Sequence, residues 1–177
     1  MRRYFEFASG TYVLAATFVA TLAFLFLVFP NLPINGELLD LKPSYSYDEA
    51  MAALKEYGED GRTVYAWASP TLDTLFPLVY VTLFAGLIYR FRLTEGLWFL
   101  AYLPVISGMF DLLENVQVTA MLISFPEISE SQVAWASTAT SVKTFLGPIY
   151  QLLGLGLLLI AGLRAAYAKF FGGGSGS

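Results

Sequence analysis

Six polar side chains lie within otherwise apolar stretches of this chain and are its best candidates for chemistry: Ser107, Asp111, Glu114, Asn115, Asp73 and Lys143. Ser107, Asp111 and Asn115 are spaced four residues apart, so a helix would carry them on one face. Glu114 follows Asp111 by three residues and joins the edge of that face. Two carboxylates this close in a low-dielectric setting resist being ionised together unless Lys143 or a cation neutralises one of them. The pattern indicates an acid/base pair, a proton site or a hard-cation site.

The composition decides the class of protein in which these residues must work. Of the 177 residues, 56% are hydrophobic and only 14% are charged, whereas soluble domains average about 25% charged residues. The chain has no cysteine and no histidine, which excludes disulfides, thiolate sites, histidine-bound zinc or haem, and a Ser-His-Asp triad. The net charge of −4 argues against nucleic acid as a partner. We therefore expect an integral membrane protein with no metal and no cofactor.

Four apolar stretches approach or exceed the length of about 20 residues that a membrane-spanning helix needs; they cover residues 11–29, 70–89, 97–125 and 133–163. Short loops between consecutive helices make them antiparallel neighbours. The expected fold is thus all-α, a polytopic membrane protein with an antiparallel four-transmembrane-helix bundle in a single domain, 1–171. The first stretch is interpreted as a retained anchor, because its apolar run exceeds the about 7–15 residues of a signal peptide. Residues 172–177, rich in Gly and Ser, are interpreted as a linker or tag remnant.

The positively charged residues predict which helix ends face the cytoplasm. They gather before the first stretch, between the second and third, and after the fourth: Arg2, Arg3, Arg90, Arg92, Arg164 and Lys169. We therefore expect a multi-pass protein of a bacterial plasma (inner) membrane with both termini cytoplasmic. The long segment 31–69 then lies outside.

This outer segment carries its own helix signals. Ser46 and Glu49 have the spacing of a capping box, and Gly58 supplies a stop, so a short helix is expected from about Tyr47 to Tyr57. A further helical stretch leads into the second span, where Pro70 either kinks the helix or restarts it with Ser69 as the cap. Thr94 is the expected cap of the third span, and the sequence before the fourth span resembles a second capping box. A cap of about 40 residues is too small to bury its own core, so it must rest on the helix ends, with these expected contacts: Tyr45, Tyr47, Met51, Leu54, Tyr57 and Tyr65.

The ionisable residues within the spans share one depth. With a rise of about 1.5 Å per residue, Asp73, Asp111, Glu114 and Lys143 lie about 25, 22, 27 and 31 Å from the cytoplasmic ends of their helices. The hydrocarbon core is about 30 Å thick. Three different helices therefore bring ionisable groups to the outer third of the membrane, which random scatter would not be expected to produce.

Each of these residues also has a purely structural interpretation. Asp73 would stabilise the amino end of the second span, where the helix dipole favours an anion. The two acids of the third span would pair with Lys143 or Arg62 and fix helix register. Lys143 would otherwise extend to the outer interface. Asn115 and Ser107 would serve as hydrogen-bond partners between helices.

Several short strings carry a resemblance: Leu39-Asp40-Leu41-Lys42-Pro43, Gly58-x-x-Gly61-Arg62-x-x-Tyr65, Leu72-Asp73-x-x-Phe76-Pro77-x-x-Tyr80 and Phe110-Asp111-x-x-Glu114-Asn115. With them the chain resembles uncharacterised bacterial four-helix integral membrane proteins, a group that implies the fold and no activity. The topology is also loosely similar to that of the emopamil-binding-protein and sigma-2-receptor group. That similarity implies intramembrane acids that meet a cationic apolar ligand or a sterol.

The hypothesis favoured by these observations is a protein that binds a lipid or apolar small molecule at the buried acidic cluster, in the outer half of the bundle, where acid/base chemistry is also available. Its ligand-binding residues would be Asp73, Asp111, Glu114, Asn115, Lys143 and Ser107. The alternative is a non-enzymatic structural or assembly subunit, in a homo-oligomer or with a membrane-protein partner. A third hypothesis is an ion- or proton-transport component.

Overall fold

The computed structural model describes residues 1–171, in which helices account for 86% and no strand is present. The elements in chain order are α1 (Arg2–Ala8), α2 (Thr11–Ala23), the π-helical turn η1 (Phe24–Val28), the 3-10 turns η2 (Phe29–Asn31) and η3 (Leu39–Leu41), α3 (Tyr47–Glu56), α4 (Gly58–Phe91), the 3-10 segment η4 (Glu95–Ala101), α5 (Tyr102–Ser124) and α6 (Glu130–Phe171). The all-α fold class is confirmed. The expected linker or tag remnant, 172–177, lies outside the described residues.

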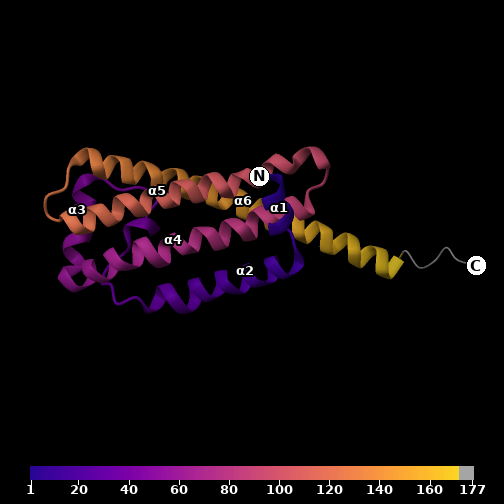
Figure 1. Ribbon diagram of the computed structural model, residues 1–177, viewed down its shortest axis with the longest axis horizontal. Coiled ribbons are helices and arrows are strands. Elements are labelled where there is room, and N and C mark those ends of the chain that lie inside the picture. Colours follow the sequence, from indigo (N-terminus) through magenta and orange to yellow (C-terminus); the bar gives the residue numbers. More distant parts are fainter. Residues whose placement is uncertain (172–177) are drawn as a thin grey trace, which may run out of the picture.

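Four helical segments within residues 1–171 are long and apolar enough to cross a membrane: Thr11–Asn31, Gly58–Phe91, Glu95–Ser124 and Glu130–Phe170. They lie side by side and run in alternating directions (Figure 1). Helix α4 packs against α1, α2, α5 and α6, and α5 also packs against α6. Helix α1 lies at the end of the molecule opposite α3 (Figure 1).

Helix α4 begins at Gly58, well before the expected start of the second span at residue 70. The expectation that Ser69 caps a helix restarting at Pro70 is therefore wrong. Ser69 is fully buried inside α4, and its hydroxyl donates to the backbone carbonyl of Asn115 on α5, at 3.2 Å. Proline within an apolar helix is tolerated where a neighbouring helix and hydroxyl side chains supply hydrogen bonds, and this turn has both.

The other two expected caps had different outcomes. Thr94 occupies the N-cap position of η4, where the third span begins, but its side chain makes no capping hydrogen bond, so only the position is confirmed. The regular helix α5 starts only at Tyr102, after the 3-10 segment. Before α6, the N–H of Gln132 donates to Ser129 Oγ at 3.2 Å, which confirms a serine cap at this start.

Helix α3 begins where the sequence predicts. The N–H of Glu49 donates to Ser46 Oγ, and the N–H of Ser46 donates to Glu49 Oε2 at 2.7 Å, which is a reciprocal capping box. The helix ends at Glu56, and Gly58 then adopts a φ of 66°. Glycine takes this left-handed conformation at little cost, so the chain can turn sharply from α3 into α4.

The capping box should make part of the stability depend on pH. Hydrogen bonds from the backbone N–H and the hydroxyl of Ser46 hold the pKa of Glu49 below its ordinary value. A carboxylate with a depressed folded-state pKa contributes stability above its ordinary pKa, and this contribution is lost as the pH falls through the folded-state value. Glu49→Gln, which removes the charge at nearly constant volume, is therefore expected to lower the melting temperature at neutral pH and to have much less effect in acid, as measured by thermal unfolding in detergent. An equal loss at both pH values would contradict this.

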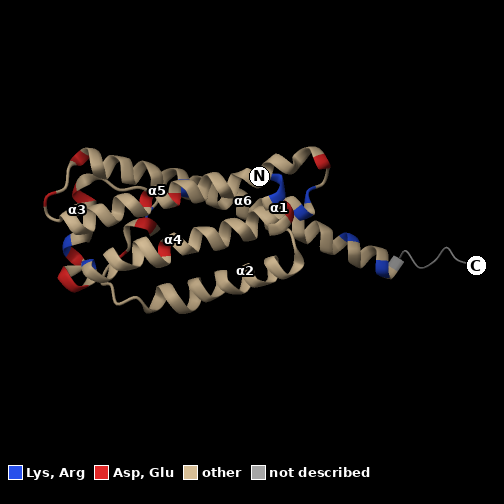
Figure 2. Ribbon diagram, viewed as in Figure 1, with Lys and Arg blue, Asp and Glu red and all other residues tan. Residues whose placement is uncertain are grey.

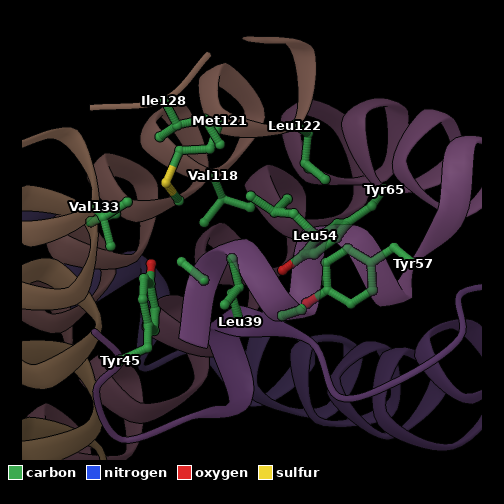
Figure 3. Close-up of a cluster of buried hydrophobic side chains, with 13 residues drawn as sticks. Leu39, Tyr45, Leu54, Tyr57, Tyr65, Val118, Met121, Leu122, Ile128 and Val133 are labelled. Carbon is green, nitrogen blue, oxygen red and sulfur yellow. The ribbon is translucent and has the colours of Figure 1, made fainter. Parts of the chain in front are cut away.

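The outer segment and the ends of α4, α5 and α6 share one hydrophobic cluster (Figure 3). Four of the six expected cap contacts, Tyr45, Leu54, Tyr57 and Tyr65, belong to it, and the other two, Tyr47 and Met51, pack against it. The hydroxyl of Tyr57 donates to the backbone carbonyl of Glu37 at 2.8 Å, and that of Tyr65 donates to Asp40 Oδ1 at 3.0 Å. These contacts fix the outer segment over the helix ends and place Asp40 beside α4.

Charge is distributed unevenly along the molecule (Figure 2). Acidic residues are concentrated at the end where α3 lies, and arginines gather at the opposite end, around α1 and the connection from α4 to η4. At that end the guanidinium of Arg2 lies 4.5 Å from the centre of the Trp98 ring. Arg90 donates to the carbonyl of Ser9 and to Thr11 Oγ1. The basic residues therefore also hold α1 and α2 to the rest of the fold.

Candidate functional site

A cavity of about 760 Å³ lies between α2, α4, α5 and α6, beneath the outer segment. Small-molecule sites typically measure about 300–1,000 Å³. It is lined by Thr21, Leu25, Phe29, Pro30, Leu38, Asp40, Leu41, Asp73, Phe76, Tyr80, Phe84, Asp111, Lys143, Thr144, Gly147, Pro148, Tyr150 and Gln151. Aromatic and aliphatic side chains therefore form most of the wall, while three carboxylates and one ammonium group supply the charge.

Three of the six predicted site residues line this cavity: Asp73 from α4, Asp111 from α5 and Lys143 from α6. The shared depth inferred from the helical rise thus corresponds to a meeting of three helices in space. The other three predicted residues, Glu114, Asn115 and Ser107, are buried but do not line the cavity.

Lys143 is the centre of a buried ionic network. Its Nζ lies 2.5 Å from Glu114 Oε2 and 3.3 Å from Asp111 Oδ1. The hydroxyl of Tyr80 donates to Asp111 Oδ2 at 2.9 Å, and that of Thr140 donates to Glu114 Oε1 at 2.6 Å. Every carboxylate oxygen of the pair thus has a partner. The lysine does not extend to the outer surface, because its side chain is only 17% exposed.

Arg62 is not the partner of these acids. Its Nη1 donates to the backbone carbonyl of Leu54 at 3.0 Å, and its guanidinium lies 4.5 Å from the centre of the Phe125 ring. Of the two cations that the sequence offered as partners for Asp111 and Glu114, the structure therefore selects Lys143.

Asp73 differs from the other two acids. The residue is only 7% exposed and lines the cavity. Its carboxylate makes no hydrogen bond and no ion pair with any group in residues 1–171. Because α4 begins at Gly58, Asp73 lies deep within the helix and not at an amino end, so the helix-dipole interpretation is wrong. A buried carboxylate without a partner is costly, and it calls for a proton, a hydrogen-bond donor or a cation from the cavity.

Asn115 and Ser107 lie behind the cavity wall. The side-chain amide of Asn115 donates to the backbone carbonyl of Asp73 at 2.7 Å, which is the interhelical role considered for it. Ser107 is fully buried on α5, next to Tyr80 and Tyr150. Neither side chain reaches the space in which a ligand could lie.

Several residues of the site were missed by sequence reasoning. Tyr80 follows Asp73 by seven residues and Thr140 precedes Lys143 by three, so helical spacing could have placed each beside a chosen residue. Asp40 has no such signal, because it belongs to the outer segment and reaches the cavity only through the fold of that segment. Within residues 1–171 no three acidic side chains are arranged to hold a metal ion.

Comparison with protein-family models, with curated proteins and with solved structures finds no match to this chain. The class of protein therefore follows from its own architecture. Within residues 1–171 the chain is all-helical, with four helices of membrane-spanning length and apolarity. Between them lies an apolar cavity that carries a paired acid, an unpaired acid and a lysine.

Proposed function

We propose that the chain is an integral membrane protein that binds a lipid or apolar small molecule in this cavity, with the polar head of the ligand at Asp73. The observation that carries the proposal is the carboxylate of Asp73, which is buried without a partner in the wall of a cavity lined mostly by aromatic and aliphatic side chains. A ligand that brings an apolar body and a hydrogen-bond donor or a cation would satisfy both parts of the site.

Placement in a membrane is supported by what the helices expose. Large apolar side chains such as Phe18, Phe26 and Leu27 lie uncovered on α2 and η1, where water would make them an aggregation hazard and lipid would solvate them. The arginines at the α1 end support a cytoplasmic location for that end by the positive-inside rule. In this orientation both chain ends are cytoplasmic and the cavity lies in the outer half of the bilayer.

The rim of the cavity suggests how a ligand reaches it. Leu25 and Pro30 on one side, and Thr144, Pro148 and Gln151 on the other, are lining residues that are also exposed at the surface. The first pair comes from the continuation of α2 and the other three from α6. A molecule dissolved in the outer leaflet would pass between these two helices, with its apolar part against Phe29, Phe76 and Phe84 in the wall.

Asp73 and Asp111, two of the three acids that line the cavity, also suit acid/base chemistry on such a ligand. Asp111 is held by Lys143 at Oδ1 and by the Tyr80 hydroxyl at Oδ2, so both of its oxygens already have partners. Asp73, with no such partners, can accept a proton from the ligand or return one. Transfer of a proton between Asp73 and a bound ligand is therefore the chemistry that the site could support.

One observation favours the structural alternative. The Lys143 network joins α5 to α6, and every carboxylate oxygen in it has a partner. Such a network can fix the register of the two helices without having any other role. This network needs no ligand, and the structural hypothesis explains it without one. Asp73 distinguishes the ligand-binding hypothesis from the structural hypothesis, because a purely structural network does not require an unpaired acid beside it.

Native mass spectrometry of the gently extracted protein tests the proposal. Thr144→Trp should fill the mouth of the cavity, and Asp73→Asn removes the charge at nearly constant volume. Loss of a charge-assisted hydrogen bond predicts about a tenfold drop in bound ligand for Asp73→Asn, and the tryptophan should abolish binding. Matched controls are Thr138→Trp, at an exposed site of α6 outside the cavity, and Asp48→Asn, an exposed acid of the cap.

The expected result is a discrete bound lipid or small molecule in the wild type and in both controls, lost or reduced in the two cavity variants. Folded cavity variants that retain the same bound species as the controls would overturn the proposal. A wild-type protein that carries no ligand, while Lys143 variants fail to assemble, would favour the structural alternative.

A further inference from the structure

The main chain of α4 has an interruption at the turn that carries Asp73. Pro77 lies four residues after Asp73 and has no N–H. The backbone carbonyl of Asp73 therefore lacks the donor that the next helical turn would normally provide. The segment is buried, and a buried carbonyl without a donor costs free energy comparable to a lost hydrogen bond.

A side chain of α5 supplies the missing donor. Asn115 is 3% exposed, and its Nδ2 donates to the backbone carbonyl of Asp73 at 2.7 Å. The contact is reciprocated one turn earlier, where Ser69 Oγ donates to the backbone carbonyl of Asn115 at 3.2 Å. Thr74 Oγ1 in turn donates to the carbonyl of Ser69 at 3.1 Å. The turn of α4 that bears the unpaired acid is thus attached to α5 at two points.

The same face of α5 also carries Asp111, a second acid of the cavity. Asp111 and Asn115 are four residues apart and project from the same side of the helix. Asp111 lines the cavity itself, whereas Asn115 donates a hydrogen bond to the main-chain carbonyl of Asp73. Helix α5 therefore sets the position of the Asp73 carboxylate relative to that of Asp111.

We propose that Asn115 is a positioning residue, which holds the carboxylate of Asp73 in the cavity by replacing the backbone hydrogen bond that Pro77 removes. The inference rests on the proposed function, since it concerns how the binding site is held in position. The hydrogen bond from Asn115 to the Asp73 carbonyl does not depend on any ligand. Asn115 does not touch the ligand and acts only through the α4 main chain.

The test is a double-mutant cycle between Asn115→Leu and Pro77→Ala in the full-length protein. Pro77→Ala returns an N–H to the position four residues after Asp73, so the carbonyl no longer needs the asparagine. Asn115→Leu in the wild-type background is expected to lower the melting temperature by about 5 °C, the equivalent of one stranded buried carbonyl in a chain of this size. In the Pro77→Ala background the same change should cost little.

The second readout follows Asp73 itself. Dicyclohexylcarbodiimide is an apolar reagent that attacks carboxyl groups accessible from the membrane phase, and peptide mass spectrometry identifies the residue labelled. Asn115→Leu is expected to change the labelling rate of Asp73 by about threefold or more, since the fixed turn becomes free to shift. Pro77→Ala should remove this effect as well. Gln117→Leu, a partly exposed position on the same helix, is the matched control and should change neither readout.

Two results would overturn the inference. Asn115→Leu could be equally damaging in both backgrounds, which would mean that the asparagine contributes by packing alone. Alternatively, the melting temperature could fall while the labelling rate of Asp73 stays constant, which would make Asn115 merely structural. The labelling requires no natural ligand. A wild-type protein without any bound lipid would therefore contradict the proposed function, but the double-mutant cycle between Asn115→Leu and Pro77→Ala would still test the role of Asn115.

Discussion

Replacing Lys143 with methionine is expected to destabilise the protein by about 4 kcal/mol, because it leaves the carboxylates of Asp111 and Glu114 buried without their cation. Glu114 has no exposed surface in its side chain, and Asp111 has 10%, so water cannot compensate. In a chain of this size such a loss corresponds to a fall of roughly 10 °C in melting temperature. Thermal unfolding of the detergent-solubilised protein, followed by tryptophan fluorescence, measures it.

The control for this prediction neutralises all three groups at once. In a triple variant with Asp111→Asn, Glu114→Gln and Lys143→Met, no buried charge is left without a counter-charge. Replacing a complete buried ion network often changes the free energy of unfolding very little. The triple variant should therefore be more stable than Lys143→Met alone, although it carries more changes. If the single variant were as stable as the wild type, the short Lys143–Glu114 contact would have no energetic importance and the structural alternative would lose its basis.

The helices of this fold were largely predictable from composition and length. Uninterrupted apolar stretches gave the number of long helices, since few other structures bury so many apolar residues in runs of this length. The start of α4 was not predictable in the same way. Pro70 is typical of a helix boundary, whereas α4 runs without a break from Gly58 to Phe91, and the buried hydroxyl of Ser69 donates to the main chain of α5 instead of capping a new helix.

The candidate site was predictable where helical spacing carries information. The four-residue spacing on α5 indicated that Asp111 and its neighbours share a face, and the helical rise brought Lys143 to a similar level. That rise separated Lys143 from Asp111 by about 9 Å along the helix axes, whereas in the structure Lys143 Nζ lies 3.3 Å from Asp111 Oδ1.

Other parts of the site could not be predicted from spacing. Asp40 reaches the cavity from an irregular segment, for which no periodicity gives a depth. The sequence also could not predict that Asp73 is unpaired, because the absence of partners within residues 1–171 depends on the position of every neighbouring side chain. Spacing placed the acids together, and only the packed structure distinguishes the satisfied pair from the carboxylate that faces the cavity.

The second large effect is expected at Gly86, where α1 crosses α4. A Cβ at this position would meet the backbone carbonyl of Ala8, and Leu14 Cδ2 at 2.9 Å. Because the first obstacle is main chain, no side-chain rotation can make room. Gly86→Ala should therefore displace α1, cost about 2–3 kcal/mol as an overpacked contact, and expose Phe5, which is fully buried in a hydrophobic cluster that includes Ala85 and Ile88 of α4.

Gly156→Ala provides a control of opposite sign. A Cβ there meets nothing within 4 Å, so the alanine only improves helix propensity and should leave stability unchanged or raise it by about 0.5–1 kcal/mol. Hydrogen exchange resolved to peptides should then show faster exchange of α1 in Gly86→Ala and wild-type protection of α1 in Gly156→Ala. Since Asp73 lies more than three helical turns before Gly86 on α4, ligand retained by Gly86→Ala would assign α1 to anchoring the end of the fold that carries Arg2 and Trp98. If α1 kept its protection in that variant, the close approach of Ala8 to Gly86 would not be a real constraint.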